Sequence, residues 1–258
     1  MPRLSIVIPV FNEEASIREL LERTRAAALP AGWEKELIVV DDASTDGTAR
    51  AVREFCSLHP EICPVLCLAQ PANRGKGASL RAGFAAAAGD AILVQDADLE
   101  YDPGDYRRML EALVLRRADA VYGSRFLSGE RVTTLAHRSI NWLLTAFSNL
   151  FTRLHLSDVH TCLKLFQADA IRGLDLEEER FGFCPEVTAK LARKPGVIIV
   201  EVPVSYRPRT RQLGKKVGFR DGVRALYCTV KYSLQGAQFQ HNETKLHHEI
   251  LSSHSRPQ

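Results

Sequence analysis

The stretch Ala91-Ile-Leu-Val-Gln-Asp-Ala-Asp-Leu-Glu100 joins a short apolar run to acidic residues at alternate positions. Its first half, residues 91–95, predicts a strand that is buried in a sheet. Side chains alternate along an extended chain, so Asp96, Asp98 and Glu100 lie on the same side. Two carboxylates at this spacing can share a hard cation such as Mg²⁺ or Mn²⁺, which keeps open positions for phosphate oxygens. Glu100 is the candidate third ligand.

Further apolar strands precede and follow this stretch, and they alternate with helices over the first 125 residues. Continuous apolar strands that alternate with helices are typical of a parallel sheet covered on both faces. The sequence therefore predicts an α/β fold. The expected strands are 4–10, 36–41, 64–68, 91–95 and 118–122, and the expected helices are 13–28, 44–56, 77–88 and 104–116.

The rest of the chain is less regular, but no linker or internal repeat separates it from the first part. Residues 1–235 are therefore predicted to form one domain, with a first half at 1–125 and a second half at 126–235. Residues 236–258 are polar and are expected to be a loosely ordered tail. The helices expected in the second half are 133–154, 185–193 and 219–234, and the strands are 161–167 and 197–204.

Composition narrows the class of protein. The 258 residues are 45% hydrophobic and 25% charged, a globular balance that argues against a disordered or coiled-coil chain. With 34 basic and 31 acidic residues the net charge is only +3, so no nucleic-acid binding is expected. No apolar run reaches the roughly 18–20 residues of a membrane span, and the chain begins in a strand without a secretory signal. We therefore expect a cytoplasmic protein.

The six cysteines form no CxxC pair, and a chain of this size needs no disulfide framework. Cys56, His59, Cys63 and Cys67 lie close together in the sequence, which makes a metal site conceivable. Their spacing fits no common zinc motif, so reduced and mostly buried thiols are the favoured interpretation.

Polar side chains follow each of the first four strands, where ligands bind in an open parallel sheet. Clustered carboxylates repel one another, and a divalent cation relieves that repulsion. For Asp42 and Ser44 a helix-capping role is the alternative. The patterns GxxxxGK[ST] and GxGxxG are absent, which disfavours a P-loop and a dinucleotide-binding Rossmann enzyme. The residues in question are Glu13, Asp41, Asp42, Asp96, Asp98 and the glycine-rich basic turn at 73–77.

Several short motifs lie around these strand ends and further along the chain. They are Ile8-Pro-Val-Phe-Asn-Glu-Glu14, Val39-Val-Asp-Asp-Ala-Ser-Thr-Asp-Gly-Thr48, Asn73-Arg-Gly-Lys-Gly77, Gln95-Asp-Ala-Asp-Leu-Glu-Tyr-Asp-Pro103, Tyr122-Gly-Ser-Arg-Phe126, Phe181-Gly-Phe-Cys-Pro-Glu-Val-Thr188, Glu201-Val-Pro-Val-Ser-Tyr206 and Gly214-Lys-Lys216. In this order the chain resembles glycosyltransferase family 2 over residues 4–235, and more narrowly its dolichyl-phosphate mannosyltransferase and polyprenyl-phosphate glycosyltransferase branch. The resemblance implies the GT-A fold, a Rossmann-like, mostly parallel central sheet flanked by helices, with an acceptor-side helical subregion after it.

The resemblance also implies roles for individual residues. Those of the nucleotide-sugar site are Pro9, Phe11, Glu13, Asp41, Asp42, Lys76 and Asp96. The residues that would bind the metal bridging the diphosphate are Asp96, Asp98 and Glu100. Those that hold an acceptor phosphate are Arg125, Arg138 and Ser139. Those of the catalytic set are Asp98, Arg125, Arg209 and Lys215.

The implied chemistry breaks a sugar C1–O bond, and a metal and fixed cations stabilise the charge that grows on the diphosphate. Residues 203–220 contain six basic residues and no acidic one. They predict a loop over diphosphate and acceptor, with a solvated basic face as the alternative. A phosphate monoester is largely a dianion at neutral pH, so as an acceptor it needs cations rather than a general base. Glu186 is the leading candidate for a base, and orienting a helix is its alternative role.

The predicted helix at 133–154 has a strong apolar pattern, which fits packing on the sheet, contact with a membrane, or both. The resemblance implies a metal-dependent, inverting glycosyltransferase that moves a hexose from a nucleotide sugar (GDP-mannose or UDP-glucose type) to a polyprenyl phosphate. It also implies peripheral association with the cytoplasmic face of a membrane and a membrane-protein partner or downstream flippase. The alternatives are transfer to a hydroxyl acceptor and a non-catalytic nucleotide-sugar-binding subunit.

Overall fold

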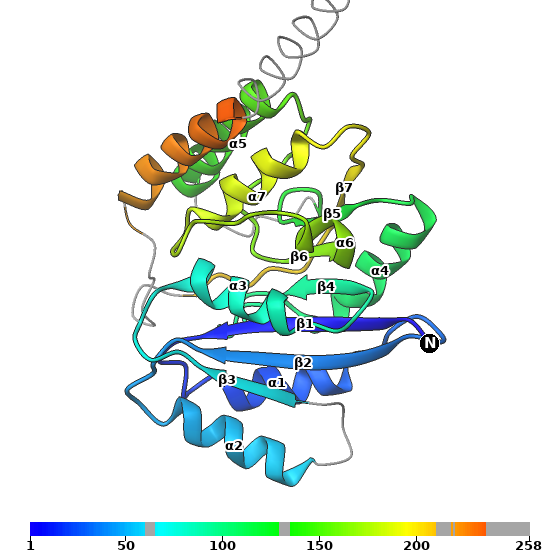
Figure 1. The fold of residues 1–258 in the computed structure, drawn as a ribbon, viewed down its shortest axis with the longest axis vertical. Helices are drawn as coiled ribbons and strands as arrows, with labels where there is room; N and C mark the ends of the chain where they lie inside the picture. Colours follow the sequence, from blue (N-terminus) through cyan, green and yellow to red (C-terminus); the bar gives the residue numbers. More distant parts are fainter. Residues whose placement is uncertain (60–64, 129–134, 210–217, 219, 236–258) are drawn as a thin grey trace, which may run out of the picture.

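The computed structural model describes residues 1–59, 65–128, 135–209, 218 and 220–235 and has a central seven-stranded sheet (Figure 1). The strand order is β3-β2-β1-β4-β6-β5-β7. The strands are β1 (Arg3–Val10), β2 (Glu34–Asp41), β3 (Val65–Ala69), β4 (Ala91–Val94), β5 (Ala120–Ser124), β6 (Lys164–Gln167) and β7 (Ile199–Pro203).

The sheet is mostly parallel, as predicted, but one strand runs the other way. β1, β2, β3 and β4 form parallel pairs, and so do β5 and β7. β6 lies between β4 and β5 and is antiparallel to both. The first five predicted strands are therefore not five consecutive neighbours, because a strand from the second half of the chain separates β5 from the rest.

Apolar side chains on alternating sides of the strands build a core on each face of the sheet. In β1, Leu4, Ile6 and Ile8 belong to one cluster and Val7 belongs to the other. Each buried aliphatic side chain contributes roughly 1.5–3 kcal/mol of transfer free energy. The first face is covered by α1 (Ile17–Ala26), α2 (Thr48–Leu58) and α4 (Tyr106–Leu115), and the second by α3 (Lys76–Ala86), α6 (Ala168–Arg172) and α7 (Phe183–Ala192).

An outer helical layer lies over α7 at one end of the molecule (Figure 1). α5 (Leu135–Thr152) packs against α7, and the helix over 220–235 packs its Cys228 and Tyr232 against Ala189 of α7. This layer corresponds to the helical subregion that the resemblance implies, but it does not simply follow the sheet, because α5 precedes β6 and β7 in the chain. Over the described ranges, no helix combines the length and the apolar character that crossing a bilayer requires.

The predicted helices and strands all have a counterpart in the described residues, with ends that shift by a few positions. The helix predicted from residue 44 begins only at Thr48, because residues 43–47 form the loop after β2. The helix predicted from residue 104 is preceded by the short 3-10 turn η1 (Pro103–Asp105). The short helix α6 was not predicted. The predicted tail at 236–258 lies outside the described residues.

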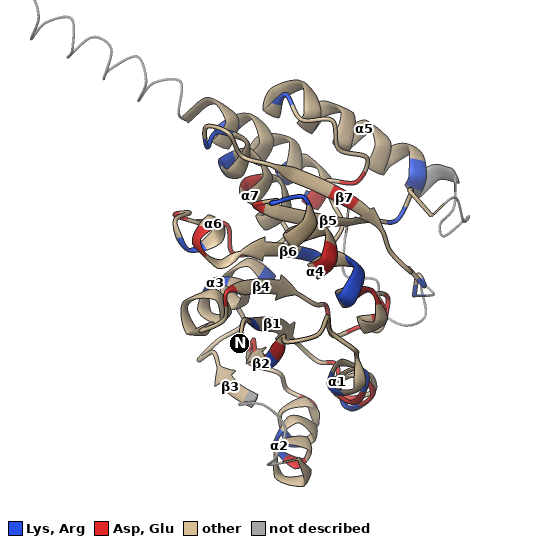
Figure 2. Ribbon diagram, turned by 90° about the vertical axis from the view of Figure 1, so that its right-hand side faces the viewer, with Lys and Arg blue, Asp and Glu red and all other residues tan. Residues whose placement is uncertain are grey.

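Residues of both charge signs lie along α1 (Figure 2), where Arg23 pairs with Glu19 and Arg25 with Glu22. α5 carries Arg138 as its single Lys, Arg, Asp or Glu residue. The two helices thus differ strongly in charge.

Candidate active site

Six carboxylates lie at or just after the carboxyl ends of three neighbouring parallel strands, and we call them the carboxylate edge. The strands are β2, β1 and β4, which run side by side in the same direction, with Val10 opposite Asp41 and Val7 opposite Val94. Side chains that follow these strands therefore emerge at one edge of the sheet, as the sequence predicts. The members of the carboxylate edge are Glu13, Asp41, Asp42, Asp96, Asp98 and Glu100.

Lys76, the first residue of α3, forms an ion pair with Asp96. Their side chains are only 14% and 16% exposed. Burial disfavours both charges, but the attraction between the two groups, together with their other neighbours, outweighs it, so the pKa of Asp96 is lowered and that of Lys76 is raised. The two predicted donor-site residues therefore lie together at the edge as a charged pair.

Asp98 has the opposite environment. Burial and the nearby carboxylates of Asp96 and Glu100 raise the pKa of Asp98 to about 7. Its Oδ1 accepts a hydrogen bond of 3.1 Å from the backbone N–H of Glu100. A group of this kind gains most from an added positive charge, and a strongly shifted pKa is typical of functional sites.

The carboxylate edge has the donor chemistry that a hard divalent cation requires. In the described part of the chain, no three His, Cys, Asp or Glu side chains already converge as a complete metal site. Asp96 is paired with Lys76, and Glu100 accepts hydrogen bonds from the Tyr206 hydroxyl (2.9 Å) and the Arg209 backbone N–H (2.8 Å). Mg²⁺ commonly takes one or two carboxylates and completes its shell with phosphate and water. Asp98, helped by Asp96 or Glu100, fits that requirement.

Arg209 joins the end of β1 to the acidic loop after β4. Its guanidinium contacts both carboxylate oxygens of Glu13 at 2.6 and 3.2 Å, and its Nε donates to the backbone carbonyl of Asp98 at 2.8 Å. The structure thus brings the predicted catalytic Arg209 to the carboxylate edge, with Glu13 as its ion-pair partner. Lys215, also predicted as catalytic, lies outside the described residues.

Asp42 holds the glycine-rich turn before α3. Its carboxylate accepts hydrogen bonds from the backbone N–H groups of Arg74 (2.8 Å) and Gly75 (2.7 Å), and its side chain is buried. Asp41 accepts one from the backbone N–H of Ser44 at 3.0 Å. Both aspartates thus organise loops at the edge, a turn-holding role in place of the helix cap that the sequence offered as an alternative for Asp42.

Pro9 and Phe11 are half-buried at the end of β1 and after it. Pro9 lies within the strand, opposite Val40 of β2, and Phe11 follows the strand directly. Both positions are close in sequence to the carboxylate edge, so the expectation that they line a nucleotide pocket remains a prediction.

Arg125 and Arg138, the predicted acceptor arginines, flank the ring of Phe126. Their Cζ atoms lie 5.6 and 5.9 Å from the centre of that ring. Arg125 is mostly buried and forms a two-pronged ion pair with Asp158, through Nε and Nη2 at 2.7 Å each. Arg138 is exposed, as is its neighbour Ser139. Arg138 therefore offers the accessible charge, and Asp158 is the ion-pair partner of Arg125 that the sequence did not predict.

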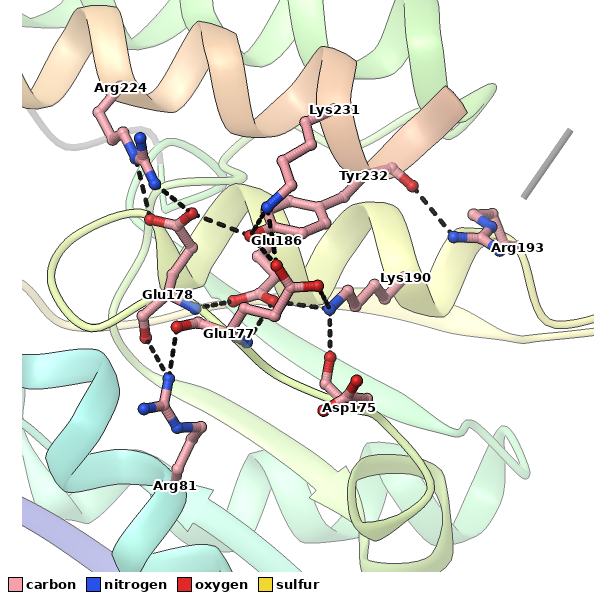
Figure 3. A network of polar contacts seen from close by, with 10 residues as sticks. All are labelled: Arg81, Asp175, Glu177, Glu178, Glu186, Lys190, Arg193, Arg224, Lys231 and Tyr232. Atoms are coloured by element: carbon pink, nitrogen blue, oxygen red, sulfur yellow. Dashed lines mark hydrogen bonds and ion pairs between the residues drawn. The ribbon is translucent and has the colours of Figure 1, made fainter. Parts of the chain in front are cut away.

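Glu186 lies within a network of charged groups drawn in Figure 3. It is fully buried and accepts hydrogen bonds from the backbone N–H groups of Glu177 (2.6 Å) and Glu178 (2.9 Å) and from Lys190 (2.8 Å). A carboxylate held by three donors orients the chain around it. The geometry thus favours the orienting role over the role of general base.

The cysteines near the end of α2 form no metal site among the described residues. Cys56 and Cys67 lie with their sulfurs 3.5 Å apart as free thiols, and His59 pairs with Glu22 at 2.9 Å. Cys63 lies outside the described residues. The described cysteines are free thiols, but only Cys228 is fully buried and Cys67 is exposed, so the expectation of mostly buried thiols is wrong.

Comparison with known proteins agrees with this architecture. Residues 5–174 match the sequence model of the family described as "Glycosyl transferase family 2". The chain therefore belongs to glycosyltransferase family 2, as the resemblance implied.

Two curated relatives are about equally similar to the chain. Dodecaprenyl-phosphate galacturonate synthase from Rhizobium johnstonii is 32% identical over 213 residues, which cover 82% of this chain and 61% of the relative. Undecaprenyl-phosphate mannosyltransferase from Micrococcus luteus is 32% identical over 215 residues, which cover 80% of this chain and 84% of the relative. The chain thus spans less than two thirds of the Rhizobium protein's length.

Solved structures confirm the GT-A fold. Glucosyl-3-phosphoglycerate synthase from Mycobacterium tuberculosis, in complex with Mn²⁺, UDP and phosphoglyceric acid, matches with a TM-score of 0.65 at 21% identity, over 90% of this chain and 78% of that one. The mannosyltransferase PcManGT from Pyrobaculum calidifontis, in complex with GDP-mannose and Mn²⁺, matches with a TM-score of 0.59 at 19% identity, over 91% of this chain and 70% of that one.

Proposed function

We propose that this chain transfers a hexose from a nucleotide sugar to a polyprenyl phosphate, with inversion at the sugar C1 and with Mg²⁺ or Mn²⁺. The observation that carries the proposal is the carboxylate edge, where Asp98 lies beside two carboxylates and next to the Lys76–Asp96 pair. The relatives named for transfer to dodecaprenyl and undecaprenyl phosphate support this acceptor.

On the donor side, Asp98 would hold the metal together with Asp96 or Glu100. The bound metal would neutralise the charge that grows on the leaving diphosphate. Lys76 keeps Asp96 ionised, and Arg209 fixes the acidic loop against Glu13. A preorganised cluster of this kind needs little rearrangement as the C1–O bond breaks.

On the acceptor side, the phosphate oxygen would attack C1 as the diphosphate leaves. Arg138 supplies exposed positive charge for that phosphate. Arg125 has five N–H donors, of which the ion pair with Asp158 engages two, so it can add hydrogen bonds to the same phosphate. Since Glu186 is held by three donors, a mechanism without a general base fits best.

The outer helical layer would bring the site to a membrane. α5 exposes Ile140, Trp142, Leu143 and Leu150, which are 57–75% exposed. A helix with large outward apolar side chains and little charge is suited to the interface of a bilayer. A polyprenyl phosphate presents its headgroup at that interface, so the apolar layer and Arg138 at its start would act on one ligand.

The test is release of nucleoside diphosphate by the purified protein with Mn²⁺ or Mg²⁺. GDP-mannose, UDP-glucose and UDP-N-acetylglucosamine are each supplied with and without a short polyprenyl phosphate. We expect one donor to support release that depends on the lipid phosphate. Release with a glycan acceptor but not with the lipid would replace the proposal by transfer to a hydroxyl group. Tight donor binding with no release in any arm would identify a binding subunit instead.

A further inference from the structure

Tyr206 lies between groups that the proposed function assigns to opposite substrates. Its hydroxyl donates a hydrogen bond to Glu100 Oε2 at 2.9 Å. Its ring centre lies 5.2 Å from Cζ of Arg125, within the range of a cation–π contact. One side chain thus contacts a candidate metal ligand through its polar end and a candidate acceptor arginine through its ring face.

The position of this ring is fixed from several directions. Tyr206 forms an isolated antiparallel bridge with Tyr101, and the two ring centres lie 5.1 Å apart. Tyr101 is fully buried, and its hydroxyl is in hydrogen-bond contact with the backbone N–H of Cys162 at 3.2 Å. Tyr206 therefore cannot move without disturbing a buried neighbour, which makes its two contacts geometrically linked.

Both partners of Tyr206 are themselves held in place. Glu100 accepts a second hydrogen bond, 2.8 Å long, at Oε1 from the backbone N–H of Arg209, and its carbonyl accepts one from Arg207 at 2.8 Å. Arg125 is held by the buried Asp158 on its other side.

We infer that Tyr206 is a positioning residue that sets the donor and acceptor subsites relative to each other. Its hydroxyl orients Glu100 toward the metal and diphosphate, and its ring orients Arg125 toward the acceptor phosphate. This inference rests on the proposed function. It assigns a separate task to each part of one side chain, so two substitutions separate the tasks: Tyr206→Phe removes only the hydroxyl, and Tyr206→Leu removes the aromatic face as well.

The experiment measures two constants for each variant. One is the Kd for Mn²⁺, titrated by calorimetry in the presence of the nucleoside diphosphate that the wild type binds. The other is the KM for undecaprenyl phosphate in the release assay. Tyr206→Phe should weaken Mn²⁺ binding about tenfold, the scale of one hydrogen bond to a charged group, and leave the acceptor KM within about twofold. Tyr206→Leu should raise both constants about tenfold.

The matched control is Tyr227→Phe, because Tyr227 is an exposed tyrosine that also lies against an arginine, at 4.9 Å from Arg224. It should leave both constants at wild-type values. An unchanged Mn²⁺ Kd in Tyr206→Phe overturns the inference, as does an equal loss of kcat in both Tyr206 variants with neither constant moved. If Tyr206→Leu does not fold, Tyr206→Phe decides alone.

Failure of the proposed function gives a different result. In that case the wild type itself shows no release that depends on lipid phosphate. The calorimetric titration of Mn²⁺ needs no acceptor, so it still compares wild type with Tyr206→Phe. A weakened Kd then supports the link between Tyr206 and Glu100, and an unchanged Kd rejects it.

Discussion

Asp98 has an environment that is poorly suited to a carboxylate without a bound cation. Burial and two carboxylate neighbours raise its pKa to about 7, whereas Asp96, two positions earlier, is kept ionised by Lys76. Two aspartates of one motif thus have different electrostatic surroundings. The difference indicates that Lys76 neutralises the charge of Asp96, whereas an added cation would neutralise that of Asp98.

Asp98→Ala should lower sugar transfer by at least about 100-fold, because it removes the principal ligand of the proposed metal. The protein should remain folded, since the change deletes one of three repelling carboxylates. The measurement is nucleoside diphosphate release together with a thermal melt. Asp169→Ala, at an exposed aspartate of α6, is the control and should be fully active. Wild-type activity in Asp98→Ala would contradict the metal assignment.

Arg138→Ala should raise the KM for the lipid phosphate about tenfold and leave the donor KM within about twofold. The reason is its exposed guanidinium beside Phe126 and Arg125. Steady-state kinetics with each substrate varied in turn gives both constants. Arg116→Ala, at the exposed end of α4, serves as the control. A donor KM that rises as much as the acceptor KM would argue against the assigned role.

The pKa of His160 predicts how this residue makes stability depend on pH. Burial and the nearby Lys164 lower its pKa from 6.5 to about 4. The unfolded chain therefore binds a proton at His160 between these values and the folded protein does not, so His160 lowers the stability as pH falls from about 6.5 to about 4, whereas Asp98, with its raised pKa, acts in the opposite direction. The loss due to His160 is about 1–3 kcal/mol and is measured as the difference between wild type and His160→Gln in urea unfolding at several pH values, the variant losing that much less on acidification. A loss of the same size in His160→Gln would assign it to other groups.

At the scale of elements, α3 begins in close contact with the acidic segment that precedes α7. Gly75 has a φ of +98°, and a Cβ at Gly77 would lie 2.1 Å from the backbone oxygen of Glu178. Arg81 donates to the backbone carbonyl of Glu177 at 2.6 Å (Figure 3). The position of Lys76, between the two glycines, thus depends on a segment about 100 residues further along the chain.

Gly77→Ala should destabilise the protein by about 1–3 kcal/mol, because its methyl group meets backbone rather than a flexible side chain. Gly222→Ala is the matched control: nothing lies within 4 Å of a Cβ there, and the residue is helical. It should be neutral or stabilising by up to about 1 kcal/mol. Chemical denaturation of the two variants and the wild type gives the comparison. Equal stability of the two variants would show that the contact at Gly77 relaxes without cost.

The strands and most helices could be predicted because their signal is local: apolar runs for the strands and a period near 3.6 for the helices. The direction and place of β6 could not be predicted. The sequence of its four residues, Lys164–Gln167, does not show whether the strand runs parallel or antiparallel to its neighbours. Its place and direction follow from its pairing with β4 and β5. The same holds for α6, which is only five residues long.

The sequence predicted the candidate site residues that lie directly after a strand. It did not predict the contacts between residues that are far apart in the chain. Asp96 and Asp98 come shortly after a buried strand, so their position at the edge of the sheet could be predicted from the sequence. The contact of Glu13 with Arg209 joins residues 196 positions apart and leaves no local pattern. Asp158 and Tyr206 were missed for the same reason, although Tyr206 ends a stretch that carried the family resemblance.

At the scale of the whole molecule, apolar side chains gather on the outer helical layer. α5 exposes Ile140, Leu143 and Leu150, and the helix over 220–235 exposes Val223 and Leu234. The two helices lie at the same end of the molecule (Figure 1). These are the residues that the proposed function would place against a lipid surface.

The double change Leu143→Glu and Leu150→Glu should weaken binding to anionic lipid vesicles at least about fivefold, because it puts two charges on the apolar face of α5. Vesicle flotation measures the bound fraction. Leu115→Glu is the control, at an equally exposed leucine on α4, 80% exposed against 75% for Leu150. If the double variant binds like the wild type, α5 is not the surface that contacts lipid.

The most direct measurement is mass spectrometry of the lipid after incubation of the protein with polyprenyl phosphate, Mn²⁺ and the donor that supports release. We expect a new species that is heavier by one hexose and linked through the lipid phosphate. This species should be absent without Mn²⁺ and with Asp98→Ala. An unchanged lipid, with nucleoside diphosphate released and the sugar free or on another acceptor, would rule out transfer to the polyprenyl phosphate.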